Sequence, residues 1–487
     1  MVRGGWLEPS RSAIAPRFMS ALAPIPVATG PAPASGREEM RALLRLATPL
    51  VAANLLQMAV YAVDVVFVAR LGEVELAAAT LGVYLYGIIM WALIGLTGAA
   101  APLIAAELGA RAHSVREVRR SFRMAMWLAV VAGAPFLLLL AHGRELLVLA
   151  AQDPRVAERA DAFLDILLWA MIPAVAAGVM RSTAAALGRP AYAMAVTAVA
   201  VVVAIAANWA LVFGNAGFPR LGLEGSALAS LLTTIAMALA YAAILLLDRR
   251  MRRYRLFGRW WRTEWSRLAE IVRLGLPIAA TVTFEGALFG GAGFLMGLIG
   301  VTEVAAHAVA LNIAAVAFQV PFGIGQAATI RVGMAYGAAD RRWIGRAGWA
   351  ALGLTVAFMA ATAAGLLLFP RLFVSLYVDV DAAANARLVA LAVDLLLVGA
   401  MFQLFDGGQA VAAGVLRGLQ DTRVPMIVAL FGYWIAGFGT AALLGFRAGW
   451  GGIGIWLGLA VGVAVVYELL LWRWAARERL GLLPTAA

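Results

Sequence analysis

Residues 78–108 read AATLGVYLYGIIMWALIGLTGAAAPLIAAEL and carry no charged side chain before Glu107. About 20 apolar residues in a helix are enough to cross the ~30 Å hydrocarbon layer of a membrane. The run is continuously apolar rather than alternating, which argues against a strand of a membrane β-barrel. Eleven other segments have the same character, so the sequence predicts twelve membrane-spanning helices. Their approximate spans are 44–70, 78–108, 121–142, 162–187, 190–213, 223–247, 267–299, 303–336, 347–369, 385–416, 424–446 and 450–475.

The composition of the whole chain supports an all-α integral membrane protein. Of its 487 residues, 63% are hydrophobic and 14% are charged, against roughly half and a quarter in soluble domains. The mean hydropathy is +0.89. These values exclude a soluble enzyme, a nucleic-acid-binding module and a disordered regulator as the main function class. The chain has no Cys and only His113, His142 and His307, so a thiolate or His-rich metal site is disfavoured and we expect no cofactor.

The chain is strongly basic, with a net charge of +12 and a sequence pI near 10.8, and every basic residue is Arg. Such a charge can indicate a nucleic-acid partner, but Arg also accumulates in the cytoplasmic loops of membrane proteins. The arginines gather in the even-numbered loops, above all at residues 111–123 and 249–267. We therefore expect a multi-pass protein of the bacterial inner membrane, with both termini and all even loops in the cytoplasm and no nucleic-acid partner.

The two halves of the chain repeat each other. A shift of 228 residues, from 45 to 273, aligns residues 45–110 with 273–338 without a gap, and matches Pro and Gly at corresponding helix positions. A repeat of six crossings keeps its orientation in the membrane. The repeat predicts two six-helix bundles related by a pseudo-two-fold axis along the membrane normal, with a binding site between them near the midplane.

Residues 1–40 are rich in Pro, Ala, Ser and Arg, with four prolines between positions 24 and 33. These prolines oppose a helix. The segment also lacks the apolar core of 7–15 residues that a signal peptide needs. We expect a disordered cytoplasmic leader whose removal is harmless, or a start assigned too early, with Met19 or Met40 as the true start. The predicted organisation is this leader at 1–40, an N-terminal six-helix bundle at 41–247, a basic cytoplasmic linker at 248–266, a C-terminal six-helix bundle at 267–476 and a cytoplasmic tail at 477–487.

Three acidic residues lie deep inside apolar segments: Asp64 in the first, Glu285 in the seventh and Asp406 in the tenth. An ionisable side chain in a membrane helix is costly, so each is a candidate functional residue. The alternative is a carboxyl group that is neutral or paired and only holds helices together. No Arg at the same depth offers a permanent partner, so these groups can accept a proton or hold a monovalent cation, and we consider Na⁺ at Glu285 and Asp406. The repeat relates Glu285 to Gln57 and Asp64 to Ala292, so the halves share a scaffold but not their charges.

Polar and aromatic residues accompany the three acids at spacings that place them on the same helix faces. An aromatic ring beside a carboxylate suits an amphipathic organic cation, although packing is the commoner role of a single Phe. The supporting candidates on the acid-bearing segments are Gln57 in the N-terminal half, and Thr281, Phe289, Phe402, Gln403 and Gln409 in the C-terminal half. Asn208 is a further candidate, as the one strongly polar residue inside the fifth segment.

No enzyme motif is present in the sequence. It lacks a GxxxxGK[ST] phosphate loop, an HExxH metal motif and a GxSxG nucleophile motif. The nearest pair of carboxylates, Asp379 and Asp381, falls in a short external loop, which disfavours an integral-membrane transferase. Without an ATP-binding motif, transport must be driven by an ion gradient or by an outside partner.

Residues 40–475 resemble the multidrug and toxic compound extrusion (MATE) transporter family, and in particular its NorM-like branch. The strings that carry the resemblance are Arg70-Leu71-Gly72, Leu276-Pro277-Ile278, Phe284-Glu285, Leu311-Asn312-Ile313-Ala314, Phe402-Gln403-x-Phe405-Asp406-Gly407, Tyr433-Trp434 and Gly454-Ile455-Trp456.

The resemblance implies a V-shaped pair of six-helix bundles that alternates between inward-open and outward-open states. It further implies a monomeric antiporter that exports cationic, amphipathic drugs in exchange for Na⁺ or H⁺. Glu285 and Asp406 match the acids of the family's C-terminal half, which act in cation coupling and substrate binding, and Asp64 matches the first-helix acid of other branches. Tyr433 joins the supporting candidates. The alternative is an exporter or flippase of an endogenous metabolite or lipid-linked substrate, although the deep Arg residues expected for anionic lipid carriers are missing.

Overall fold

The computed structural model describes residue 33 and residues 35–111, 114–149 and 152–484. Within these ranges the chain is helical and contains no strand. Twelve helical segments are long and apolar enough to cross a membrane, which confirms the twelve predicted spans.

The N-terminal half supplies six of these segments, each formed by one helix or by consecutive helices. They are α2 (Gly36–Val68), α3 (Glu73–Gly98) with α4 (Ala100–Ala110), α5 (Val115–Leu140), α7 (Pro154–Leu167) with η1 (Leu168–Ala170) and α8 (Met171–Ala186), α9 (Ala191–Phe213) and α10 (Gly222–Leu247), with the short α6 (Gly143–Leu149) between crossings.

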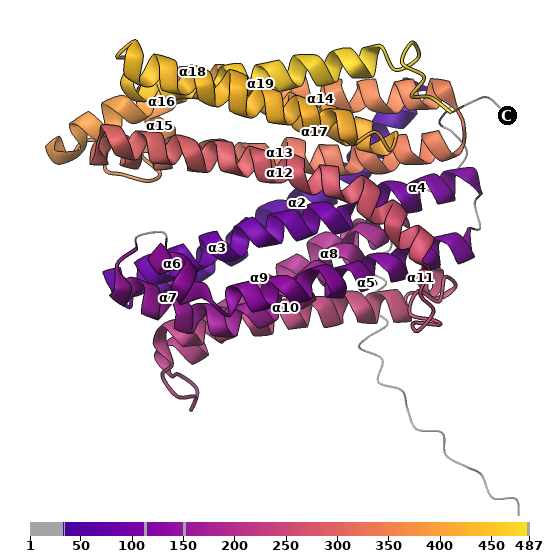
Figure 1. Ribbon diagram of the computed structural model, residues 1–487, viewed down its shortest axis with the longest axis horizontal. Coiled ribbons are helices and arrows are strands. Elements are labelled where there is room, and N and C mark those ends of the chain that lie inside the picture. Colours follow the sequence, from indigo (N-terminus) through magenta and orange to yellow (C-terminus); the bar gives the residue numbers. More distant parts are fainter. Residues whose placement is uncertain (1–32, 34, 112–113, 150–151, 485–487) are drawn as a thin grey trace, which may run out of the picture.

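The C-terminal half supplies the other six and begins after the short linker helix α11 (Arg249–Arg252). They are α12 (Trp265–Ile299), α13 (Val301–Gly337), α14 (Arg341–Leu368), α16 (Ala386–Gly418), the broken helix α17 (Arg423–Leu430), η3 (Phe431–Phe438), α18 (Gly439–Ala442) and η4 (Leu443–Arg447), and α19 (Gly451–Ala475), with α15 (Pro370–Val374) and η2 (Ala383–Asn385) between crossings. Figure 1 shows the two halves as two layers, with α2 and α3 of one beside α12 and α13 of the other.

The predicted leader boundary is wrong by a few residues. Residues 1–32 and 34 lie outside the described residues, but α2 already begins at Gly36, within the predicted leader. The Ser35 side chain accepts a hydrogen bond from the backbone N–H of Glu38 at 3.3 Å, and this cap starts the helix. Glu39 is fully buried. The sequence signal was the spacing of Ser35 and Glu38, which is that of a capping box.

Glycine contacts between the halves repeat with the predicted symmetry. A Cβ added to Gly109 would lie 1.9 Å from the carbonyl oxygen of Met334, and one added to Gly337 would lie 1.8 Å from that of Ala106. The 228-residue shift relates Gly109 to Gly337 and Ala106 to Met334, so one contact is the image of the other. Only glycine permits this approach of the two backbones. These contacts support a pseudo-two-fold axis between the halves.

The linker between the halves is tied to the N-terminal bundle. Asp248 caps α11 through the backbone N–H groups of Arg250 and Met251, and it accepts a hydrogen bond from the Tyr192 hydroxyl at 2.7 Å. Burial alone would raise the pKa of Asp248. These hydrogen bonds and the nearby guanidinium of Arg189 outweigh burial and hold that pKa below its ordinary value.

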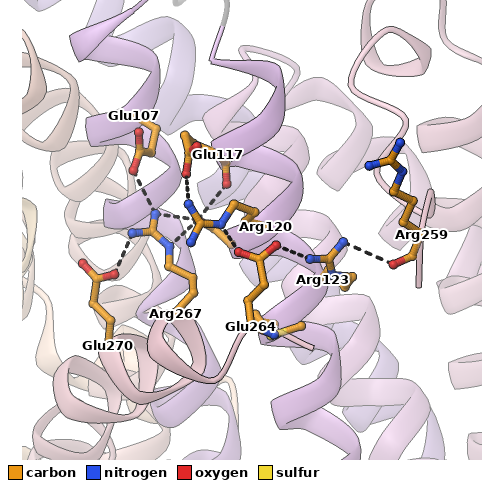
Figure 2. Close-up of polar contacts among 10 residues, drawn as sticks. Glu107, Glu117, Arg120, Arg123, Arg259, Glu264, Arg267 and Glu270 are labelled. Atoms are coloured by element: carbon orange, nitrogen blue, oxygen red, sulfur yellow. Dashed lines mark hydrogen bonds and ion pairs between the residues drawn. The ribbon is translucent and has the colours of Figure 1, made fainter. Parts of the chain in front are cut away.

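The end of the linker forms a network of ion pairs, which Figure 2 shows. Glu264 pairs with Arg120, and also with Arg123 of α5 at 2.6 Å. Arg267, in the first turn of α12, contacts Glu107 of α4 at 3.0 Å and donates to the Ser121 hydroxyl at 2.7 Å. Because α12 belongs to the C-terminal half and α4 to the N-terminal half, this network joins the halves. We call this end of the molecule the linker end.

Candidate functional site

Two carboxylates of the C-terminal half lie close to one amide. Glu285 is on α12, and Asp406 and Gln409 are one turn apart on α16. The Gln409 Nε2 donates to Glu285 Oε1 at 2.7 Å. The Tyr433 hydroxyl donates in turn to Gln409 Oε1 at 2.7 Å. Three helical segments therefore converge on a chain that runs from Tyr433 through Gln409 to Glu285.

The hydrogen-bond chain ends at Tyr433 in a distorted helix. Tyr433 lies in η3, a π-helical stretch of eight residues, and its side chain is fully buried. π-helical stretches are rare in proteins, and those that occur often lie at functional sites. The sequence resemblance identified Tyr433 as a candidate, but nothing in the sequence indicated the π-helix.

The buried polar atoms next to this chain lack partners. Asp406 is 5% exposed and Gln403, one turn away on α16, is 1% exposed. Among the described residues, Asp406 Oδ1 and both side-chain polar atoms of Gln403 have no hydrogen-bond partner. Buried polar atoms are rarely left unsatisfied, so such a group calls for an explanation. Oxygen atoms in this state can take up a proton or a cation.

A cluster of aromatic rings begins one helical turn from each of the two acids. Phe289 of α12 and Phe402 of α16 meet edge to face, with ring centroids 6.0 Å apart. Phe402 also contacts Trp456 of α19 at 6.0 Å, and the Trp456 indole N–H donates to His307 Nδ1 at 3.1 Å. Edge-to-face geometry is the favourable arrangement for aromatic pairs. The two predicted phenylalanines therefore lie together, in a cluster that extends to Trp456 and His307.

Thr281, one turn before Glu285 on α12, makes no hydrogen bond to this acid. Its hydroxyl donates to the carbonyl oxygen of Pro277, one turn earlier in α12, at 2.8 Å. Thr often bonds to the i−4 carbonyl in a helix, so this local bond satisfies the hydroxyl.

The third acid has its own partners in the N-terminal half. Asp64 of α2 accepts hydrogen bonds from Asn208 Nδ2 of α9 at 2.7 Å and from the Ser230 hydroxyl of α10 at 2.6 Å. Asn208 is fully buried, as expected for a residue that serves the acid. Gln57 is half-buried on the same helix as Asp64, and no hydrogen bond joins the two among the described residues.

None of the three acids forms an ion pair in the described part of the chain, although the Arg417 guanidinium acts on Glu285 electrostatically from a longer distance. None of the ion pairs found there includes Asp64, Glu285 or Asp406. No group of three or more His, Cys, Asp and Glu that could hold a metal ion occurs there either. The acids thus form two separate groups, one in each half, and both are bonded mainly to neutral side chains.

Both halves of the chain match a single protein family. The MatE family matches residues 49–210 and 277–443, which contain the acids of the two halves. The chain belongs to the MatE family. Its resemblance to MATE transporters is thereby confirmed, and it is a multi-pass membrane transporter rather than an enzyme.

Relatives within the MatE family extend over nearly the whole chain. The chain is 46% identical over 444 residues to the "Probable multidrug resistance protein NorM" of Mesorhizobium japonicum, covering 91% of this chain and 95% of the relative. It is 40% identical over 431 residues to the "Multidrug resistance protein NorM" of Burkholderia vietnamiensis, covering 88% and 92%.

Solved structures confirm the fold. A eukaryotic MATE transporter superposes with a TM-score of 0.81 at 21% identity, covering 92% of this chain and all of that one. An outward-facing multidrug resistance MATE family transporter superposes with a TM-score of 0.81 at 20% identity, covering 92% and 97%. The all-α fold with two six-helix halves is therefore that of the MatE family.

Proposed function

We propose that the chain is a monomeric secondary antiporter that exports cationic amphipathic drugs in exchange for Na⁺ or H⁺. It acts in a bacterial inner membrane with both termini in the cytoplasm. The observation that carries this proposal is that the C-terminal acids Glu285 and Asp406 belong to no ion pair between described residues and lie at the network of Gln409 and Tyr433. The names of the NorM relatives support export of drugs.

The unpartnered atoms near Asp406 suit a small cation. Asp406 Oδ1 and Gln403 Oε1 are buried oxygens without a hydrogen-bond partner among the described residues. A proton on Asp406, or a Na⁺ ion between the two oxygens, would satisfy them. Glu285 is held by Gln409 at 2.7 Å and is half-buried. We assign the coupling cation to Asp406 and Glu285, with Gln403 as a supporting ligand.

The aromatic cluster supports binding of an organic cation. Phe289 lies one turn beyond Glu285 on α12, and its ring contacts Phe402, which lies one turn before Asp406. A cation gains from the faces of aromatic rings and from a nearby carboxylate together. Substrate and coupling cation then compete for the same carboxylates, because either one neutralises the charge that attracts the other. Such competition is reciprocal, so each ligand weakens binding of the other by the same factor.

The contacts between the halves support alternating access. At the linker end, Arg331 of α13 donates to the buried Glu39 of α2 at 2.9 and 2.5 Å, and the Trp343 indole N–H of α14 donates to the same carboxylate at 2.9 Å. The 228-residue shift relates Glu39 to Arg267, which pairs with Glu107 across the halves. Two ionic clamps, each with its carboxylate in the N-terminal half and its guanidinium in the C-terminal half, thus hold the linker end closed. They must open to admit substrate from the cytoplasm.

The proposal is tested by efflux of ethidium from vesicles that contain the purified full chain, with Na⁺ and proton gradients imposed separately. We expect one of the two gradients alone to drive efflux. The proposal of cation coupling is wrong if neither gradient drives efflux from the vesicles, whereas efflux from native membranes occurs and depends on ATP hydrolysis by another protein.

A further inference from the structure

A basic hollow lies at the linker end of the C-terminal half, away from the acids. It is open to the surface and has a volume of about 560 Å³. Four guanidinium groups face one carboxylate in its lining. The lining residues are Arg341, Arg342, Gly345, Arg346 and Trp349 from the start of α14, and Arg477 and Glu478 just beyond α19.

Arg477 is held in position before any ligand binds. Its guanidinium group lies 4.6 Å from the centre of the Trp474 ring, and its Nη1 donates to the Trp474 carbonyl oxygen at 2.9 Å. Gly345 makes room for it, because a Cβ there would lie 3.1 Å from Arg477 Nη2. The Arg477 Nε is buried and has no hydrogen-bond partner among the described residues. The guanidinium group is therefore fixed at the hollow, where its positive charge favours an anion.

The neighbouring face of α14 changes from charged to apolar along its length. Arg342, Arg346 and Trp349 are four and three residues apart, so they share one helix face. Trp349 is 46% exposed, and Val356, seven residues further along the same face, is 41% exposed. Arg341 and Arg342 are exposed and take part in no ion pair between described residues, and Arg341 donates to the Pro484 carbonyl oxygen at 3.3 Å. The hollow therefore offers cationic groups at one end and an exposed apolar strip at the other.

We propose that this hollow binds the headgroup of an anionic phospholipid, with the phosphate against the arginines and the acyl chains along the apolar strip of α14. Basic pockets between membrane helices on the cytoplasmic side are suited to anionic headgroups. Trp349 lies where the charged and apolar surfaces meet, and Trp is typical of the membrane–water interface. A free phosphate ion would use the arginines but not the strip. The site is separate from the acids, so it stands independently of the proposed antiport.

The test is native mass spectrometry of the purified full chain with phosphatidylglycerol, and with phosphatidylcholine as the neutral reference. We expect wild type to retain phosphatidylglycerol in preference. The double substitution Arg341→Gln/Arg342→Gln should weaken this binding about 30-fold, since each surface arginine contributes a factor of about five. The matched control is Arg249→Gln/Arg250→Gln on the exposed linker helix α11, which removes the same charge at the same end of the molecule and should bind as wild type.

Arg477→Gln gives a second variant that leaves the exposed arginines intact, and it should also weaken phosphatidylglycerol binding. Equal binding of phosphatidylglycerol by wild type, by Arg341→Gln/Arg342→Gln and by Arg477→Gln would overturn the proposal. So would an equal loss in the α11 control, because binding would then reflect net charge alone. Displacement of the lipid by millimolar inorganic phosphate would identify a free-anion site instead.

Discussion

At the scale of single residues, Glu285 and Asp406 are arranged to hold charge only transiently. A carboxylate that must stay ionised inside a membrane protein is usually paired with a cation. Here Glu285 accepts a hydrogen bond from the neutral Gln409 at 2.7 Å, and Asp406 Oδ1 has no partner in the described chain. A proton or a small cation can therefore enter and leave without breaking an ion pair.

We predict that Glu285→Gln and Asp406→Asn each abolish gradient-driven ethidium efflux while expression and monodispersity stay normal. Removing one partner of a buried ion pair costs about 3–5 kcal/mol, but neither acid has such a partner. Efflux from vesicles at matched protein levels measures the effect. Wild-type rates in both variants would contradict the assignment of these acids.

Tyr433→Phe tests the far end of the same chain. The substitution removes the hydroxyl that donates to Gln409 Oε1 at 2.7 Å, and a buried acceptor left without its donor costs about 1–3 kcal/mol. With Gln409 freed to reorient, Glu285 loses its defined position. We expect substrate affinity to fall about fivefold or more, measured by titration with a fluorescent cation. The isosteric ring keeps the packing, so an unchanged affinity would show that Tyr433 has no role in positioning Glu285.

Sequence reasoning could identify the acids but not all of their partners. The depth of Asp64, Glu285 and Asp406 in apolar segments is a strong signal, because few charges occur there. Ser230 was missed, since a serine in an apolar helix is common and its contact with Asp64 depends on how α10 is rotated against α2. The contact between Trp456 and His307 could not be predicted, because it joins residues 149 positions apart in the sequence.

At the scale of elements, the start of α2 decides how much of the leader can be removed. We predict that deletion of residues 2–34 leaves ethidium efflux unchanged, because the Ser35 cap and Glu39 remain. Deletion of residues 2–39 removes both and should reduce folded protein and efflux. Size-exclusion profiles and efflux of the two truncations measure the difference. Equal behaviour of the two truncations would contradict a role for Ser35 and Glu39.

Hydropathy predicted all twelve crossings, whereas the ends and irregularities of helices depended on particular contacts. α2 extends to Gly36 because a polar cap and the buried partner Arg331 stabilise charged residues that hydropathy assigns to a tail. The π-helical stretches η3 and η4 interrupt an apolar segment that reads as one regular helix. Their position depends on packing against α19, which no local pattern encodes.

At the scale of the whole molecule, the clamps at the linker end set the balance between two conformations. Arg331→Gln leaves Glu39 buried without its charged partner, which destabilises the closed linker end by about 3–5 kcal/mol. Opening exposes Glu39 to water and relieves this cost. We therefore predict that the variant shifts the population toward a state open at the linker end.

Spin labels can report this shift directly, because the chain contains no native Cys. Labels on Arg111→Cys and Ala338→Cys follow the ends of α4 and α13, which pack together in the closed state. The distance distribution should lengthen in Arg331→Gln and return toward wild type in the charge-swapped Glu39→Arg/Arg331→Glu variant. An unchanged distribution in Arg331→Gln would show that the clamp does not control opening.

Binding of a fluorescent cationic substrate to purified protein shows whether substrate and coupling cation share the acids of the C-terminal half. Affinity is measured while Na⁺ is raised or pH is lowered. In wild type either change should weaken substrate binding, Glu285→Gln should lose that sensitivity, and Asp64→Asn should keep it. If Asp64→Asn alone loses the sensitivity, the coupling site lies in the N-terminal half with Asn208 and Ser230. Substrate and coupling cation then do not share the acids of the C-terminal half.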